Sequence, residues 1–285
     1  MPSYDSARGR LRLADPHVAV LGHLADGQTP PDDLAGALAE LQHIGLVGPE
    51  GELSPLLKDL VLTFADPMVM VHAEVTGEHG VVTNGLVVGQ EAVIVYDGWP
   101  GDEEKEYVSA EPSMLVWEVA RLVNLRTGET VDPPVRRIET TMGVLDAAFV
   151  ALGETPGAEI LEAAELAREA VADAGGPAEP ALSLFADLVA ALNCTWRVTT
   201  VWDGKHEGER AASLRALAVW DCGPLGYWLR EQPEEPVLPG QVTPDSPLHL
   251  VRVSAAEVWE RLTDLLPDRA DLIDATPEAA DDAES

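Results

Sequence analysis

The sequence predicts an α+β fold of two similar halves, in which antiparallel strand meanders are flanked by helical bundles. Segments with helical apolar spacing alternate with short β-branched segments along the chain. Turn residues separate the β-branched segments, which favours antiparallel connections. The order of elements in the first part of the chain also recurs in the second. Of the 285 residues, 46% are hydrophobic and 24% charged, which is typical of a globular protein.

The first half begins with a short strand or an early helix at Leu11–Leu24. Thr29 can cap a helix that ends at Gly45, and a second helix begins at Ser54 and stops before Pro67. A strand meander and a closing helix are expected next. They comprise Met68–Val75, Val81–Val88 with a break at Asn84-Gly85, Ala92–Tyr96, the end of a fourth strand at Tyr107–Val108, and a helix that carries Leu115 to Val123.

The second half follows a polar junction, Thr127–Pro134, which is the best candidate for a boundary. Its pattern predicts helices first and strands afterwards, with a proline-rich segment at Glu231–Pro247 that is unsuited to an element interior. The predicted helices are Thr141–Leu152, Ala158–Ala174, Pro180–Leu192 and Ala255–Leu266, and the predicted strands are Thr195–Trp202, Leu214–Asp221, Leu225–Arg230 and His249–Val253.

Short motifs support an internal duplication. The matching pairs are Ala92–Asp97 with Ala216–Asp221, Val108–Glu111 with Val253–Glu257, and a Val-Trp-Glu step at 116–118 with one at 258–260, each followed by Arg-Leu. Two such halves could pair their sheets about a pseudo-two-fold axis. The alternative is two ordinary α+β segments with similar amphipathic patterns.

The duplication sets the expected domain organisation. A first half covers residues 1–130, and a second half with a helical insert covers 131–267. The remaining residues, 268–285, form an acidic tail whose composition predicts disorder.

The charge balance restricts the partners. The chain has 18 Lys and Arg against 50 Asp and Glu, a formal net charge of −32. This negative charge disfavours binding to nucleic acid and to anionic membranes, because proteins that bind either one supply cationic side chains. No long apolar run predicts a membrane span, and no secretory signal is visible, so we expect a cytoplasmic location. Cys194 and Cys222 are too few for a disulfide framework, and two free thiols are favoured over one bridge.

No catalytic or metal-binding motif stands out in the sequence. Nucleophile-elbow, phosphate-loop and dinucleotide fingerprints are absent. His72, Glu74, Glu78 and His79 include metal-ligand types, but a further ligand at a recognisable spacing does not follow. We therefore expect no enzyme activity, no cofactor and no metal. An enzyme of unrecognised type remains an alternative.

A transcriptional regulator of the winged-helix type is a further alternative, because two helices, a turn and a hairpin open the chain. The helix that would enter the major groove lies within Asp32–Val47. It contains no Lys or Arg and carries acidic residues, so DNA binding is disfavoured.

Tryptophans are the first candidates for partner contacts. Trp196 and Trp202 are six residues apart on one predicted strand and should share a face. Most tryptophans on such strands belong to the core, yet Trp202 or Trp228 could serve as a binding hot spot. Trp99, in the turn from Asp97 to Asp102, is expected to be the most exposed tryptophan.

One region resembles a known family. Leu38–Pro67 contains the turn Gly45-Leu46-Val47, the segment Gly51-Glu52-Leu53-Ser54-Pro55, and a leucine-rich helix that ends in Ala65-Asp66-Pro67. With the meander, the closing helix and the last helix from Val253 to Leu266, this pattern resembles the EspG family, the ESX (type VII) secretion-associated proteins of actinobacteria. The resemblance spans most of Leu11–Leu266. Two segments depart from the family pattern, namely Asp221–Tyr227 and the proline-rich Glu231–Pro247.

The resemblance implies a quasi-two-fold α+β fold and a non-enzymatic cytosolic chaperone or adaptor, acting as a monomer or homodimer. Such proteins bind an aggregation-prone helical secretion substrate of the PE/PPE type. Contacts are expected first in the turns Thr76–Gly80 and Trp202–Glu209. The candidate partner-binding residues are Glu78, His79, Trp99, Trp202, His206 and Trp228.

Overall fold

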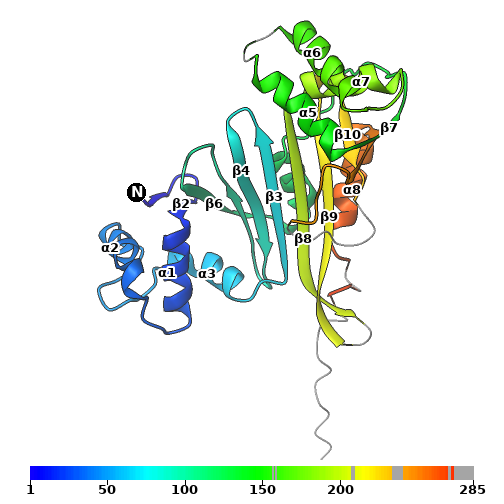
Figure 1. Cartoon of the computed structure of the whole chain (residues 1–285). Helices are drawn as coiled ribbons and strands as arrows, with labels where there is room; N and C mark the ends of the chain where they lie inside the picture. The colour runs from blue at the N-terminus through cyan, green and yellow to red at the C-terminus, as the bar shows by residue number, and fades with distance from the viewer. Residues whose placement is uncertain (156, 158, 207–208, 233–239, 269–270, 273–285) are drawn as a thin grey trace, which may run out of the picture.

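A computed structural model describes residues 1–155, 157, 159–206, 209–232, 240–268 and 271–272, without the side chains of 205–206 and 209–210. Within this part of the chain, the strands form one eleven-stranded antiparallel sheet with helices on both faces (Figure 1). The α+β fold class is therefore confirmed. Most of the predicted acidic tail lies outside the described residues.

Each half contributes a strand, three helices, a four-stranded meander and a closing helix, preceded in the first half by a short strand. The elements of the first half are β1 (Ser3–Asp5), β2 (Arg10–Ala14), α1 (Asp15–Ala25), α2 (Ala35–His43), α3 (Lys58–Ala65), β3 (Val69–Gly77), β4 (Gly80–Val88), β5 (Val93–Asp97), β6 (Glu104–Ala110) and α4 (Leu115–Leu122). Those of the second half are β7 (Arg137–Thr141), α5 (Met142–Gly153), α6 (Ile160–Asp173), α7 (Ala181–Ala190), β8 (Cys194–His206), β9 (Glu209–Asp221), β10 (Tyr227–Arg230), β11 (Pro247–Val253) and α8 (Ala255–Leu265).

The strand order shows the duplication directly. β3 and β8 pair antiparallel at the centre of the sheet, with Ala73 opposite Val198. Outward from this pair, β4, β5, β6 and β2 on one side match β9, β10, β11 and β7 on the other. The two halves therefore form one continuous sheet about a pseudo-two-fold axis between β3 and β8. The predicted residue boundaries of the halves remain a prediction.

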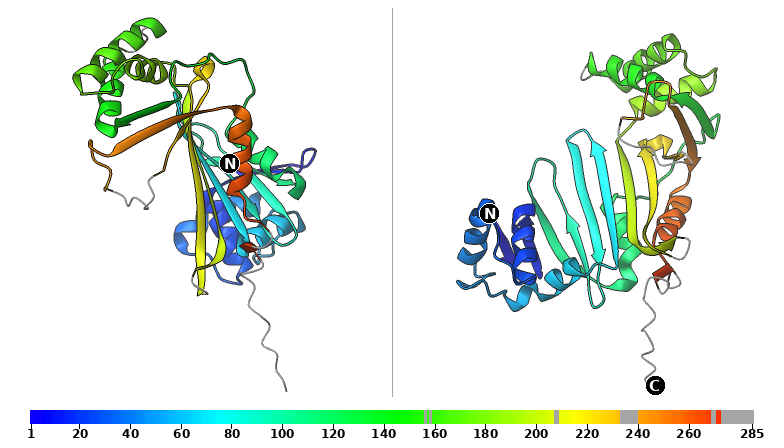
Figure 2. Two further views of the ribbon diagram at one scale, coloured as in Figure 1. Left: turned by 90° about the vertical axis from the view of Figure 1, so that its right-hand side faces the viewer. Right: turned by 60° about the horizontal axis from the view of Figure 1, so that its bottom comes forward.

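Alternating side chains divide the core between the two faces of the sheet. On one face, α4 and α8 cover a central cluster that includes Val71, Trp196 and Val258. On the other face, α1–α3 cover the first-half end of the sheet, and α5–α7 cover the second-half end. Figure 2 (left) shows α8 and the α5–α7 group on opposite sides of the strands.

Several element predictions need correction. The motif match of Ala92–Asp97 with Ala216–Asp221 pairs β5 with β9, which are the third and second strands of their meanders and so are not equivalent. Leu11–Leu24 divides into a strand and a helix. The turn predicted between Trp202 and Glu209 is mostly strand, because β8 and β9 continue as a two-stranded ribbon beyond their neighbours. Strands that pack on no core do not need alternating apolar residues, so the sequence pattern did not predict this ribbon.

The predicted break at Asn84-Gly85 is also wrong, because β4 runs through it. Buried Asn84 donates a hydrogen bond to the Leu122 carbonyl at 3.1 Å and accepts one from the Gly98 amide at 2.9 Å. Gly85 leaves room for Tyr96, since a Cβ there would lie 2.4 Å from the Tyr96 hydroxyl oxygen. The two turn-forming residues thus tie the end of α4 and the turn after β5 to the sheet.

Asn84→Leu should lower the free energy of unfolding by about 2–4 kcal/mol, because the Leu122 carbonyl and the Gly98 amide both lose a buried partner. Urea denaturation measures the change. A loss below about 0.5 kcal/mol, the size usual for surface substitutions, would show that Asn84 does not hold α4 to the sheet.

Candidate partner-binding surface

The middle of the four central strands has no helix on one face, although Trp220 at the end of β9 packs against the α5–α7 group. On β3, Val69, Val71 and Ala73 point into the core under α4 and α8, while the alternate side chains of Met70, His72 and Glu74 are exposed. Figure 1 looks onto this face, between α1–α3 at the lower left and α5–α7 at the upper right. We call this surface of β4, β3, β8 and β9 the open sheet face.

The strand register places an apolar row across the open sheet face. Met70 of β3 is paired with Val201 of β8, which is paired with Leu214 of β9. Met70 is 47% exposed and Leu214 61% exposed. On its other side Met70 is paired with Val87, which is buried next to the first-half core. We call Met70, Val201 and Leu214 the apolar strip; it offers apolar area on rigid strands that nothing in the described chain covers.

A charged row lies four residues along the strands from the apolar strip. Glu74 of β3 is paired with Arg197 of β8, and Arg197 with Ala218 of β9. Ala218 is paired in turn with Arg230 of β10. Arg230 lies beside the start of α5, the first helix of the α5–α7 group. Arg230 Nη2 contacts the Met142 sulfur at 3.4 Å. The open sheet face therefore changes from apolar to charged along the strands, with Glu74 beside Arg197 and Arg230 two strands away.

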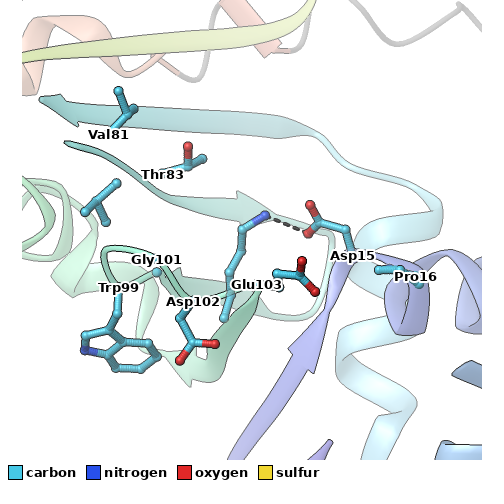
Figure 3. Close-up of a pocket in the computed structure, with 11 residues that line it drawn as sticks. Asp15, Pro16, Val81, Thr83, Trp99, Gly101, Asp102 and Glu103 are labelled. Carbon is cyan, nitrogen blue, oxygen red and sulfur yellow. Dashed lines mark hydrogen bonds and ion pairs between the residues drawn. The ribbon is translucent and has the colours of Figure 1, made fainter. Parts of the chain in front are cut away.

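A cavity of about 470 Å³ borders the open sheet face beside the first half. Figure 3 shows it between the start of α1, the start of β4 and the turn after β5. The Lys105 ammonium pairs with Asp15 at 2.6 Å and lies 5.7 Å from the Tyr96 ring centroid. Trp99 lines the same cavity, with the Arg12 guanidinium 5.8 Å from its ring.

Burial raises the pKa of Tyr96 beside this cavity to about 12, and the charge of Asp15 acts in the same direction. The pKa of Tyr107 is raised by the same two causes and by Tyr96. Both phenols therefore remain protonated at neutral pH and act as apolar rings with a polar tip. The cavity holds ion pairs and an indole, an arrangement suited to binding and positioning a group.

The predicted contact residues fall in different places. Glu78 and His79 are exposed at the tip of the β3–β4 hairpin. Trp99 is 43% exposed at the cavity. His206 ends β8 at the ribbon tip, and its side chain lies outside the described residues. The structure thus places these candidates on the rim of the open sheet face and does not bring them together.

Trp202 and Trp228 are buried, which corrects their assignment as partner contacts. Trp202 packs in the core under α8 on the same face as Trp196, as the six-residue spacing predicted, and Arg215 covers its ring at 4.8 Å. Trp228 is 0% exposed and donates its indole hydrogen to the Leu225 carbonyl at 3.2 Å. Each indole lies on a face of the sheet that helices cover, so neither is available to a partner.

The most exposed of the tryptophans is Trp117, at 61%, and not Trp99. Trp117 on α4 and Trp259 on α8 hold matching positions in the duplicated Val-Trp-Glu step. Their ring centroids lie 4.6 Å apart in an edge arrangement. The pair forms where the two closing helices meet, on the face opposite the open sheet face. Sequence reasoning found the repeat but did not foresee that its two tryptophans touch.

Both cysteines are free thiols. Burial raises the pKa of Cys194 to about 11, and the Asp221 carboxylate adds to this effect. The pKa of Cys222 is raised by burial and by Asp221. The expectation of two free thiols is confirmed, and burial together with Asp221 disfavours the reactive thiolate form of both.

Both thiols should react slowly with a disulfide reagent at pH 8 in the native protein and rapidly in urea. Unfolded thiols ionise near pH 9, whereas folded Cys194 keeps its proton to about pH 11. The contribution of Cys194 to the free energy of unfolding should therefore be constant below about pH 8 and fall between pH 9 and 11. Denaturation at a series of pH values measures this, with Cys194→Ala and Cys222→Ala as controls. A fast native reaction would contradict burial of the thiols.

Two classes of site are not found in the described part of the chain. No group of three or more His, Cys, Asp or Glu side chains there could hold a metal ion. None of the described helices is long and apolar enough to cross a membrane. The β3–β4 hairpin, which a winged-helix reading would place beside the DNA, lies in the middle of the sheet.

Comparisons with known proteins find similarity among solved structures. No protein-family model matches the sequence, and no curated protein matches it either. A solved structure of the Mycobacterium tuberculosis type VII secretion system chaperone EspG5, in complex with a PE25–PPE41 dimer, matches with a TM-score of 0.48 and 13% sequence identity. The match covers 95% of this chain and 98% of that chain. At this TM-score the likeness does not establish a function.

Proposed function

We propose that the protein is a non-enzymatic chaperone that binds an apolar helical segment of a type VII secretion substrate of the PE/PPE kind. The open sheet face is the binding surface, and the apolar strip is its centre. The sequence resemblance to the EspG family supplies the class of partner. The exposure of the strip supports the choice of this face as the binding surface.

The uncovered apolar strip is the observation that carries this proposal. Met70 and Leu214 are 47% and 61% exposed on strands whose opposite face packs against α4 and α8. Burying such a side chain against a partner contributes roughly 1–2 kcal/mol. The strip lies on paired strands, so binding does not have to order the backbone first.

The shape and charge of the chain suit this role. The α1–α3 and α5–α7 groups lie on either side of the open sheet face (Figure 2, right). A helical hairpin of the partner would dock on the surface between them. The net charge of −32 keeps a complex with an aggregation-prone partner soluble. The cavity beside Trp99 and the tip at Glu78 and His79 would contact the rim of such a partner.

Binding to purified PE–PPE heterodimers tests the proposal. A panel that includes PE25–PPE41 is mixed with the protein and followed by size exclusion with light scattering. The expected result is a stoichiometric complex with at least one heterodimer and suppressed aggregation of its PPE subunit. Failure with the whole panel, together with salt-sensitive retention on DNA, would favour the regulator alternative.

A further inference from the structure

Two arginines converge on the open sheet face. Arg197 of β8 and Arg230 of β10 are both paired with Ala218 of β9, so they point to the same side of the sheet. Two strand spacings separate their Cα atoms, about 10 Å. Because Ala218 carries only a methyl group, both long side chains can reach the space above it.

Within the described residues neither arginine forms an ion pair, although Glu74 of β3 lies directly opposite Arg197 on the same face of the sheet. In the same highly acidic protein, Arg121 and Arg137 each contact two carboxylates. The contact of Arg230 with a methionine sulfur is weak, because a thioether is a poor acceptor.

Partial burial makes the positive charge of Arg230 unfavourable. Burial lowers the pKa of Arg230, and the charge of Arg197 lowers it further. A guanidinium group can donate two parallel hydrogen bonds to a carboxylate, and both long side chains start on the same side of the sheet. An anion above Ala218 would be held by both groups and would remove their mutual repulsion.

We propose that Arg197 and Arg230 form a carboxylate-binding subsite that takes an acidic side chain of the helical segment docked on the apolar strip. This inference rests on the proposed function. Arg197 precedes Val201 of the strip by four residues on β8, about 13 Å along the strand. Nine residues of a helix span about the same length. The partner segment therefore carries Asp or Glu about nine residues from its apolar contact.

Two synthetic amphipathic helices test the subsite. They are identical except for Glu or Gln nine residues from the apolar cluster, and their binding is measured by fluorescence anisotropy at low salt. The Glu peptide should bind the wild-type protein about 10-fold more tightly than the Gln peptide. The affinity of the Glu peptide divided by that of the Gln peptide should fall to about 1 in the double variant Arg197→Gln/Arg230→Gln. It should persist in Arg261→Gln, a matched control on α8 across the sheet. An equal ratio in the wild type and the double variant would overturn the proposal.

A second measurement tests the carboxylate-binding subsite independently of the proposed chaperone function. Malonate should raise the melting temperature of the wild-type protein above that in sodium chloride of equal ionic strength, and the double variant should lose this effect. If neither peptide binds but malonate acts in this way, the chaperone proposal fails and the carboxylate site stands. The absence of a malonate effect overturns the site.

Two other outcomes would also overturn the subsite. If inorganic phosphate binds as well as malonate and the peptides show no Glu preference, the arginines hold a free anion. If Arg197→Gln/Arg230→Gln melts at a lower temperature without any added anion and malonate has no effect, carboxylates of the chain itself already neutralise the pair.

Discussion

Met70→Asp combined with Leu214→Asp weakens binding of an apolar helical partner by at least about 100-fold and leaves the fold intact. A carboxylate at each end of the apolar strip must lose water when the partner docks, and it meets no cation in the apolar contact. About 3 kcal/mol of lost binding free energy corresponds to this factor. Both side chains are about half exposed, so their replacement removes little of the core.

A matched variant on the opposite face controls for charge. Met114 and Trp117 are 43% and 61% exposed, close to the values of Met70 and Leu214. Met114→Asp combined with Trp117→Asp adds the same two charges on the side covered by α4 and α8. Partner affinity from isothermal titration should change less than about threefold. Equal losses in the two double variants would mean that added negative charge, and not the strip, weakens binding.

Trp228→Ala should lower the free energy of unfolding by about 3–5 kcal/mol, the usual cost of removing a fully buried tryptophan. The side chain is 0% exposed and packs among the helices and strands of the second half. The truncation also removes the hydrogen bond from its indole to the Leu225 carbonyl. Denaturation in guanidinium chloride measures the loss.

Trp117→Ala serves as the comparison, because it changes the same residue type at 61% exposure. It loses the edge contact with Trp259 and little else, so about 1 kcal/mol or less is expected. A small effect of Trp228→Ala would place its indole at a surface and restore it as a partner contact. A large effect of Trp117→Ala would make the closing-helix contact a major part of the core.

The duplicated architecture could be predicted from the sequence because amphipathic spacing and turn residues are local signals. The Val-Trp-Glu steps at 116–118 and 258–260 identified the closing helices correctly. The strand motif ending at Asp97 matched the wrong strand, since short Val- and Ala-rich segments are alike wherever a strand is buried. The extension of β8 and β9 was missed because Asp203 and Gly204 resemble turn residues.

The binding surface could not be predicted from the sequence, because it depends on strand register. Met70, Val201 and Leu214 are far apart along the chain, and only the pairing of β3, β8 and β9 brings them into one row. The same holds for Arg197 and Arg230, which meet over Ala218. Trp202 and Trp228 were plausible contacts as residue types, but which face of the sheet the helices cover decides their exposure.

Methyl NMR of the methionines tests the central claim that the partner docks on the open sheet face. The chain has five methionines, of which Met70 lies on the apolar strip and Met142 beside Arg230. Met114 lies in the turn that leads into α4, across the sheet. During titration with the Glu-bearing helical peptide, the Met70 and Met142 methyl signals should shift while that of Met114 stays in place. Shifts at Met114 with an unchanged Met70 signal would contradict the account.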